Sequence, residues 1–256
     1  METAGKNMVV TGASSGIGLA LVRELDRLGA RVLAVARTMD KVDTGCENVH
    51  TLAMDVSGRE NTDALFDRAL ETLGGIDIFI CNAGFAYYGP IGQADWEEIE
   101  RIYRLNVFSS IYSAQKMRDL HGGRPYRVVI TASAMSFLSV PGYALYASTK
   151  AALRGFATAY RYELGPDQRL QLVYPIATRT GFFDAAGDDT PVPWPSQTSE
   201  TVARAIVRGI QKDRDDIFPS LVFRLVNRVG GAFPPAFRMI AERENRKLAA
   251  FREQGR

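Results

Sequence analysis

The chain has very few of the side chains that hold metals or form disulfides. Its 256 residues include two cysteines, Cys46 and Cys81, and two histidines, His50 and His121. Two cysteines offer no disulfide framework and no metal spacing, and neither histidine belongs to a cluster of ligands. We therefore expect a protein that binds no metal.

The chain also lacks a strong excess of one charge and any apolar run long enough to cross a bilayer. It carries 31 basic and 29 acidic residues, a balance that gives no reason to expect a nucleic-acid partner. We find no signal peptide, internal repeat or flexible linker, so we expect a cytoplasmic protein. At 46% hydrophobic composition, residues 1–256 are enough for a single domain with one large core.

A glycine-rich turn follows the first apolar run of the chain. Residues 7–11 suit a buried parallel strand, and an apolar-periodic helix is expected from about 17 to 28. Between them stand Gly12, Gly16 and Gly18. In a nucleotide-binding turn, such glycines permit a tight turn, let the backbone approach a pyrophosphate, and let helix and strand pack closely. The pattern predicts a dinucleotide site.

Apolar runs alternate with helical patterns along the rest of the chain. Short apolar runs separated by helices predict a parallel sheet covered on both faces, a doubly wound α/β fold of the Rossmann type. Ligands bind such sheets beyond the carboxyl ends of the strands. The expected strands are residues 7–11, 31–36, 49–54, 76–81, 127–131 and 170–174, and the further helices are 61–73, 96–120 and 144–164.

Tyr146 and Lys150 stand four residues apart on an expected helix, with Ser133 a short distance upstream. Positions i and i+4 share a helix face, so the ammonium can lie beneath the phenol. A nearby cation favours the phenolate, so we expect Lys150 to lower the pKa of Tyr146 from about 10 towards working pH. Tyr146 then serves as a general acid/base, while Ser133 donates a hydrogen bond to the substrate oxygen.

The residues after the second expected strand decide between NAD and NADP. NAD enzymes place Asp or Glu there to bond the ribose 2′-hydroxyl, whereas an arginine accommodates a 2′-phosphate. This chain has Arg37 and Thr38 and no carboxylate. An arginine fork binds phosphate bidentately, so we predict NADP(H), with Ser14 as a further phosphate contact. The alternative is that Arg37 only begins a solvated loop.

On these motifs the chain resembles the classical short-chain dehydrogenase/reductase family, from about residue 8 to residue 183. TGASSGIG at 11–18 matches the family's TGxxxGxG turn, and Asp55-Val56 matches the pair that contacts adenine. The run Cys81-Asn82-Ala83-Gly84 matches NNAG, with cysteine in place of the first asparagine. Asn106, in RLNVFSS, aligns with the asparagine of the family's catalytic helix.

The resemblance implies four catalytic residues: Asn106, Ser133, Tyr146 and Lys150. It also implies that Lys150 holds the nicotinamide ribose and that Asn106 helps to maintain a water-linked proton relay. The family's PGxxxT motif reads PIATRT here, but the Thr178 backbone and the Thr180 hydroxyl can still reach the carboxamide. The predicted cofactor contacts are Gly12, Ser14, Ser15, Gly16, Ile17, Gly18, Arg37, Thr38, Asp55, Val56, Asn82, Ala83, Gly84, Tyr146, Lys150, Pro175, Thr178 and Thr180.

Residues 176–198 are expected to cover the substrate. The segment is rich in proline and aromatic residues, which is typical of a loop over an apolar pocket. We therefore expect a hydrophobic ketone or aldehyde, the alternative being that these residues anchor the loop to the core. They are Phe182, Phe183, Pro191, Pro193, Trp194 and Pro195.

Residues 219–256 form a basic and apolar C-terminal extension with eight Arg/Lys and three Asp/Glu. It lacks the Gly-rich close of the ketoacyl carrier-protein reductases and is more similar to the ends of reductases of steroids or membrane-derived lipids. Three interpretations stay open: a lid, a subunit contact, or a basic amphipathic element on an anionic membrane surface. Its apolar patches are 221–229 and 233–240, followed by a stripe of Phe237, Ile240, Ala241, Leu248 and Phe251.

Together these features predict an NADP(H)-dependent oxidoreductase that reversibly reduces the carbonyl group of a hydrophobic, lipid-like or steroid-like substrate. The alternatives are a catalytically silent NADP(H) sensor or scaffold of the same fold, and an extended-family sugar-nucleotide epimerase. The four intact catalytic positions argue against the first, and the glycine spacing argues against the second. The family commonly forms homodimers and homotetramers through the helices expected at 96–120 and 144–164, and a monomer is the alternative.

Overall fold

A computed structural model describes residues 2–40, 42, 47–180, 196–230, 242, 245 and 246. Several of the residues singled out above lie outside this part of the chain. They are Cys46, the six aromatic and proline residues of the 176–198 segment, the 233–240 patch, and the stripe from Phe237 to Phe251.

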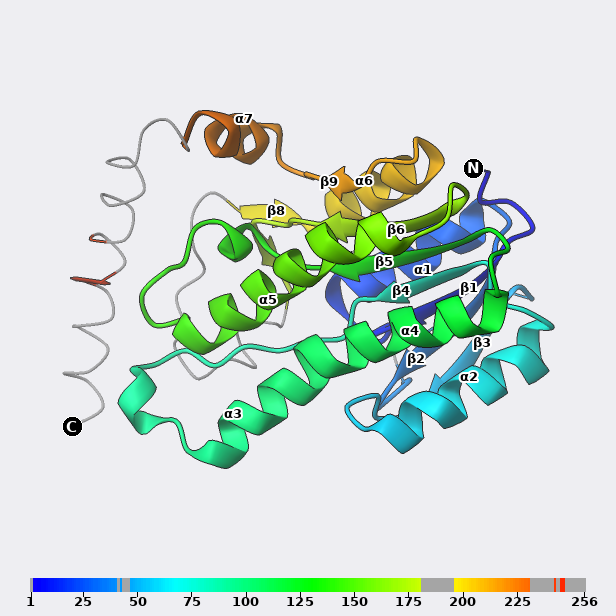
Figure 1. Cartoon of the computed structure of the whole chain (residues 1–256), viewed down its shortest axis with the longest axis horizontal. Helices are drawn as coiled ribbons and strands as arrows, with labels where there is room; N and C mark the ends of the chain where they lie inside the picture. The colour runs from blue at the N-terminus through cyan, green and yellow to red at the C-terminus, as the bar shows by residue number, and fades with distance from the viewer. Residues whose placement is uncertain are drawn as a thin grey trace.

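The core of the fold is a seven-stranded parallel sheet with the order β3-β2-β1-β4-β5-β6-β9 (Figure 1). This confirms the predicted doubly wound α/β architecture in a single domain. Because both faces of the sheet are covered, the central strands are apolar throughout instead of alternating with polar residues. The strands are β1 (Asn7–Thr11), β2 (Arg31–Ala36), β3 (Val49–Ala53), β4 (Ile78–Cys81), β5 (Tyr126–Thr131), β6 (Gln168–Val173) and β9 (Asp216–Ile217).

Helices cover both faces of the sheet (Figure 1). On one face, α1 (Gly16–Arg27) and α6 (Ser199–Gln211) pack with Met8 and Val10 of β1. On the other face, α2 (Arg59–Leu73), α4 (Ser109–His121) and α5 (Ala144–Tyr160) pack with Val9. Successive residues of β1 thus enter opposite halves of the core, as the two-residue period of a strand requires.

The helix expected over 96–120 is present from Trp96 to His121, but it is not α-helical throughout. It consists of α3 (Trp96–Tyr103), a π-helical turn η2 (Arg104–Phe108) and α4. Single π-turns inserted into α-helices are often found at functional sites. Here the turn holds Asn106, so the irregularity falls at one of the predicted catalytic positions.

Two short strands, β7 (Ala177–Arg179) and β8 (Ser196–Thr198), form a separate parallel pair. They begin and end the segment that was expected to cover the substrate. Three short 3-10 helices, η1 (Ile91–Gln93), η3 (Ala134–Ser136) and η4 (Arg161–Glu163), and the helix α7 (Leu221–Gly230) complete the elements described. Within the described residues, no helix is both long enough and apolar enough to span a bilayer.

Candidate active site

The structure brings the four predicted catalytic residues together near the carboxyl ends of β4 and β5. One lies in the π-helical turn η2, one follows β5 and caps η3, and two stand one turn apart on α5. All four side chains are buried: Asn106, Ser133, Tyr146 and Lys150.

The Tyr146 phenol lies beside the Ser133 hydroxyl, away from bulk water. Burial raises the pKa of Tyr146 to about 12, and the hydrogen bond with Ser133 opposes this only in part. The expectation that Lys150 brings the phenol close to working pH is therefore wrong for this structure. The Lys150 Nζ lies 5.5 Å from the centre of the tyrosine ring, and desolvation outweighs any help from the cation.

Lys150 is held by the end of β5. Its Nζ donates a hydrogen bond to the Thr131 carbonyl oxygen at 2.7 Å, and its own carbonyl oxygen accepts one from Ser136 Oγ at 2.8 Å. Burial lowers the pKa of the ammonium to about 8. At neutral pH the group is still mainly charged, so a cation stands below the tyrosine.

Asn106 clamps the segment that follows β4. Its Nδ2 donates to the Phe85 carbonyl oxygen at 2.9 Å, and its Oδ1 accepts from the Phe85 N–H at 3.1 Å. The same Nδ2 also donates to Thr149 Oγ1 on α5, at 3.1 Å. A side chain at Gly84 would come within 3.0 Å of Asn106 Oδ1. Asn106 thus ties the predicted cofactor segment to the helix that carries Tyr146.

The glycine turn packs too closely for side chains. A Cβ at Gly18 would lie 2.0 Å from the Gly12 carbonyl oxygen, and one at Gly12 would lie 2.8 Å from the Ala83 Cα. Gly12 and Gly16 both have positive φ angles, of +66° and +52°, which glycine adopts without strain. A Cβ at Gly16 would meet the Thr180 methyl group at 2.9 Å, so the predicted carboxamide contact lies against the glycine turn.

Thr11 is a site residue that the sequence analysis did not single out. Its Oγ1 accepts hydrogen bonds from the Asn82 and Ala83 N–H groups at 3.0 and 3.1 Å and donates to the Ile80 carbonyl oxygen at 3.3 Å. Asn82 is further held by Thr131 Oγ1, which donates to its Oδ1 at 3.2 Å. The hydroxyl of Thr11 therefore joins the ends of β1 and β4, which flank the glycine turn. Its place at the start of TGASSGIG was the available signal.

The N-terminus of α1 is suited to an anion. Ser15 occupies the N-cap position without a side-chain hydrogen bond to the helix, and no acidic residue stands in the first turn. No carboxylate in the first turn of α1 therefore accepts hydrogen bonds from its first N–H groups or neutralises the positive end of its helix dipole. These residues fit the pyrophosphate of a dinucleotide.

Residues predicted to contact the adenosine end follow β2 and β3, which are neighbours in the sheet. Arg37 and Thr38 are exposed directly after β2. Asp55 accepts a hydrogen bond from the Ser57 N–H at 2.9 Å, and Val56 is buried in the core. All four positions lie at the carboxyl edge of the sheet. The strand order reverses between β1 and β4, and these positions lie on the β2-β3 side of that point, whereas Tyr146 lies on the β4-β5 side.

Pro175 and Thr178 complete the predicted contacts. The Pro175 carbonyl oxygen accepts a hydrogen bond from the Ala134 N–H at 2.8 Å, which fixes it beside Ser133. The Thr178 hydroxyl is buried and donates to the Ile176 carbonyl oxygen at 3.0 Å. Across the described part of the chain, no group of three His, Cys, Asp or Glu residues is placed to hold a metal ion.

Comparison with known proteins identifies the family. Residues 6–191 match the family described as short chain dehydrogenase. The chain belongs to the short-chain dehydrogenases. This confirms the resemblance stated from the glycine turn, the CNAG run and the tyrosine-lysine pair.

Individual short-chain dehydrogenases match over most of their length. Human L-xylulose reductase is 29% identical over 233 residues, covering 89% of this chain and 91% of that protein. The 1-deoxy-11-beta-hydroxypentalenate dehydrogenase of Streptomyces exfoliatus is 31% identical over 238 residues, covering 85% and 84%. A Burkholderia phymatum short chain dehydrogenase solved with NAD has a TM-score of 0.80 at 22% identity, covering 91% of this chain and 95% of its own.

A second solved short-chain dehydrogenase, from Burkholderia cenocepacia in complex with NADP, also has a TM-score of 0.80, at 21% identity, covering 93% and 98% of the two chains. The solved structures establish the fold, and the family match establishes an oxidoreductase of this family. The site contains a buried phenol (Tyr146), a hydroxyl that can form hydrogen bonds (Ser133) and a buried cation (Lys150) in one cluster. Such a set of groups can move a proton to or from a substrate oxygen.

Proposed function

We propose that the protein is an NADP(H)-dependent reductase that reversibly converts a hydrophobic ketone or aldehyde to an alcohol. The observation that carries the proposal is the cluster of Tyr146, Ser133 and Lys150 next to a glycine turn fitted to a pyrophosphate. The names of relatives support a reaction that runs in either direction, since L-xylulose reductase and a hydroxynaphthalene reductase-like protein are among them, and so is a hydroxypentalenate dehydrogenase.

Each residue has a task in reduction. When bound, a reduced nicotinamide supplies a hydride to the carbonyl carbon. Tyr146 gives its phenolic proton to the carbonyl oxygen, and a pKa of about 12 keeps that proton in place at neutral pH. The Ser133 hydroxyl donates a hydrogen bond to the same oxygen as negative charge develops on it. The phenolate that remains is stabilised by the Lys150 ammonium. It regains a proton through the water-linked relay that the family resemblance implies for Asn106.

NADP(H) is favoured over NAD(H) by the end of β2. Arg37 is exposed at the edge of the sheet where the adenosine end of a dinucleotide would lie, and the three residues directly after the strand, Arg37, Thr38 and Met39, include no acidic one that would repel a 2′-phosphate. The guanidinium can bind that phosphate with two parallel hydrogen bonds. Ser14, half-buried in the turn, is a second donor for it.

A hydrophobic substrate is supported by aromatic rings around Tyr146. The Tyr143 ring lies 6.4 Å from the Tyr146 ring, and Tyr88 packs on Tyr143 with ring centres 4.9 Å apart. Phe85 and Tyr87, in the same segment after β4, meet edge to face at 5.2 Å. Rings of this kind line sites for apolar or planar compounds.

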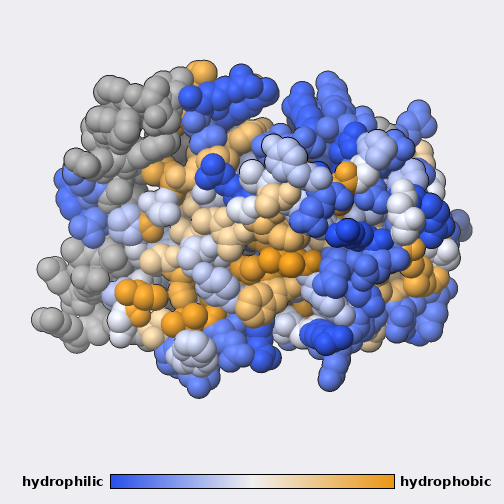
Figure 2. Space-filling model, viewed as in Figure 1, coloured by the Kyte–Doolittle hydropathy of each residue, from blue (hydrophilic) through white to orange (hydrophobic). Residues whose placement is uncertain are grey.

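We also propose that two copies associate through α4 and α5. Figure 2 shows apolar side chains gathered over α5 and the start of α4. Small residues face solvent along α5 at Ala151, Gly155 and Ala159. They are bordered by Phe108, 56% exposed, and Tyr162, 91% exposed. Small residues let two helices approach closely, and the large rings at either end can bury their surface on a partner.

The test compares NADPH and NADH binding to the native chain and to Arg37→Ala, by fluorescence titration. We expect native protein to prefer NADPH and the variant to lose most of that preference while still binding NADH. Arg68→Ala, which removes an exposed arginine of α2, is the matched control and should leave both affinities unchanged. A native preference for NADH would overturn the assignment of Arg37.

Turnover is then measured with NADPH on a panel of aliphatic, aromatic and steroid ketones. Reduction of any of them, abolished in Tyr146→Phe, supports the reductase. Tight NADPH binding without turnover on any class of carbonyl would favour the alternative of a silent sensor or scaffold.

A further inference from the structure

Helix α7 turns its aliphatic side chains towards solvent. Leu221, Val222, Leu225 and Val226 are 75%, 66%, 64% and 37% exposed, whereas Phe223 is 8% exposed. A surface helix of a globular protein usually does the reverse and places its apolar stripe on the core. In Figure 1 the helix lies on the outside of the molecule, beyond β9.

The exposed residues form an ordered surface. Leu221 and Leu225 are four positions apart and make one row on the helix, and Val222 and Val226 make the next. Arg224 and Arg228 form the row on the other side of the leucines. The helix thus presents an aliphatic strip with basic side chains along its edge, which we call the α7 strip.

Aromatic packing fixes the helix to the domain. The Phe223 ring lies 6.3 Å from Phe137 and 6.1 Å from Phe218, and Phe218 stacks on Tyr174 at 5.0 Å. Ser220 caps the helix, because its Oγ accepts a hydrogen bond from the Phe223 N–H at 3.2 Å. One buried ring therefore holds α7 with its apolar strip facing outward.

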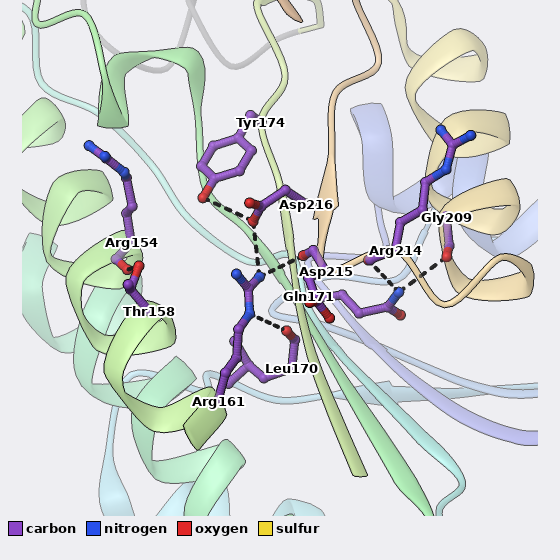
Figure 3. Close-up of polar contacts among 10 residues, drawn as sticks. All are labelled: Arg154, Thr158, Arg161, Leu170, Gln171, Tyr174, Gly209, Arg214, Asp215 and Asp216. Atoms are coloured by element: carbon purple, nitrogen blue, oxygen red, sulfur yellow. Dashed lines mark hydrogen bonds and ion pairs between the residues drawn. The ribbon is translucent and has the colours of Figure 1, made fainter. Parts of the chain in front are cut away.

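The strand before α7 is anchored by a polar network (Figure 3). Arg161 donates to the Leu170 and Asp215 carbonyl oxygens at 2.9 and 2.6 Å, and to Asp216 Oδ1 at 3.0 Å. Tyr174 donates to the same carboxylate oxygen at 3.4 Å. These hydrogen bonds tie β9, which leads into α7, to β6 and to the end of α5. The direction in which α7 faces is thus set by the fold.

Charge indicates what covers the strip. Residues 219–256 hold eight basic and three acidic residues, so the first 218 residues hold 23 basic and 26 acidic ones. The excess of positive charge along the sequence therefore lies in α7 and in the residues that follow it. A second copy would bring like charge against like charge, whereas an anionic lipid surface offers both an apolar layer and opposite charge.

We propose that α7 docks the protein on an anionic membrane surface. The α7 strip enters the boundary between head groups and acyl chains, and Arg224 and Arg228 contact lipid phosphates. Phe137, against which Phe223 packs, ends the 3-10 turn that begins after Ser133, so the docked helix lies next to the catalytic edge of the sheet. The inference does not depend on the identity of cofactor or substrate.

The test is co-sedimentation of the full-length protein with vesicles of phosphatidylcholine, with and without phosphatidylglycerol. We expect binding to the anionic vesicles that weakens at high salt. The double variant Leu221→Glu/Leu225→Glu should reduce the partition coefficient at least about tenfold, since two leucines no longer enter the apolar layer. Ile91→Glu, which changes a 57% exposed isoleucine of η1 in the same way, should bind as the native chain does.

Three results would overturn the proposal. They are no binding of the native protein to anionic vesicles, equal binding of the native protein and the double variant, or equal binding to neutral and anionic vesicles. In the second case, a change in the oligomeric state of the double variant would assign the strip to a contact between copies. Circular dichroism serves as the folding control. Both variants should give the spectrum of the native protein, because the replaced side chains are exposed.

Discussion

The Lys150 ammonium donates a hydrogen bond to the Thr131 carbonyl oxygen at 2.7 Å, at the point where β5 ends. This hydrogen bond holds a buried cation close to the Tyr146 ring. The same cation is the group predicted to bind the ribose of the nicotinamide. Among the described residues no carboxylate forms an ion pair with Lys150, so no opposite charge there offsets the desolvation of its ammonium. The site is therefore one place where function and stability are opposed.

Lys150→Met should raise the stability of the protein while abolishing turnover. Burial lowers the pKa of Lys150 from 10.5 to about 8, so the unfolded chain holds the proton more tightly than the folded one, and the native protein gains stability as pH rises through that window. We expect the variant to melt roughly 2–6 °C higher at neutral pH. The difference in melting temperature between the variant and the native protein should be smaller at pH 10, because Lys150 is then largely uncharged in the native protein. Calorimetry of both proteins at the two pH values tests this, and a variant that melts lower at neutral pH would contradict it.

Tyr146→Phe should reduce turnover by about 10³-fold or more with little change in cofactor affinity, because only the transferable proton is removed. The measurements are kcat for a reducible ketone and the Kd for NADPH. Tyr160→Phe, a change to a buried tyrosine farther along α5, is the matched control and should retain activity. Equal turnover in Tyr146→Phe and the native enzyme would remove the proposed acid.

Gly18→Ala should prevent dinucleotide binding and destabilise the fold. The added Cβ would lie 2.0 Å from the Gly12 carbonyl oxygen, a backbone atom that cannot move without opening the turn. Gly75→Ala is the control, since a Cβ there meets no atom closer than 3.8 Å. Cofactor titration and thermal melting of the two variants should separate them clearly, and normal NADPH affinity in Gly18→Ala would show that the turn does not hold the pyrophosphate.

Asp213→Asn should lower stability by about 1–2 kcal/mol, because it leaves the buried Arg127 guanidinium without its ion pair. Asparagine tolerates the positive φ of this residue. Although burial raises the pKa of the Asp213 carboxyl, the hydrogen bond and charge of Arg127 outweigh it and hold the pKa below its usual value. The stabilisation is therefore present above the ordinary carboxyl pKa and is lost as pH falls through the folded value.

Urea unfolding at neutral pH and at about pH 3.5 tests this expectation, and the difference between Asp213→Asn and the native chain should narrow at the lower pH. Glu71→Gln, which breaks an exposed ion pair with Arg68, should show no measurable effect at either pH. A difference that does not depend on pH would mean that the carboxylate charge is not what holds Arg127.

The strands and most helices could be predicted from the sequence because buried parallel strands are continuous apolar runs. Residues 7–11 and 31–36 were predicted with the observed bounds. The π-turn at Asn106 was not, because apolar periodicity continues through it. The pairing of β7 with β8 was also missed, since it joins residues separated along the chain by a long segment.

The meeting of Ser133, Tyr146 and Lys150 followed from spacing and fold, but the pKa of the phenol did not. Four-residue spacing on a helix predicts that a cation is near, whereas the pKa depends on how much water the fold excludes. The α7 strip shows a related limit. A pattern of apolar residues predicts an amphipathic helix, but it does not say whether the apolar side meets the core or something outside the molecule.

The hydroxyl of Thr11 reaches Asn82 and Ala83, more than 70 positions along the chain, and every pairing in the main sheet is parallel and joins distant segments. Loops must close before such contacts form, so domains of this topology fold slowly. A chain emerging from the ribosome can complete β1, the glycine turn and α1 without holding a dinucleotide. Because Gly12 and Thr11 both contact the residues that follow β4, we expect the glycine turn to reach its final shape only after β4 has paired with β1.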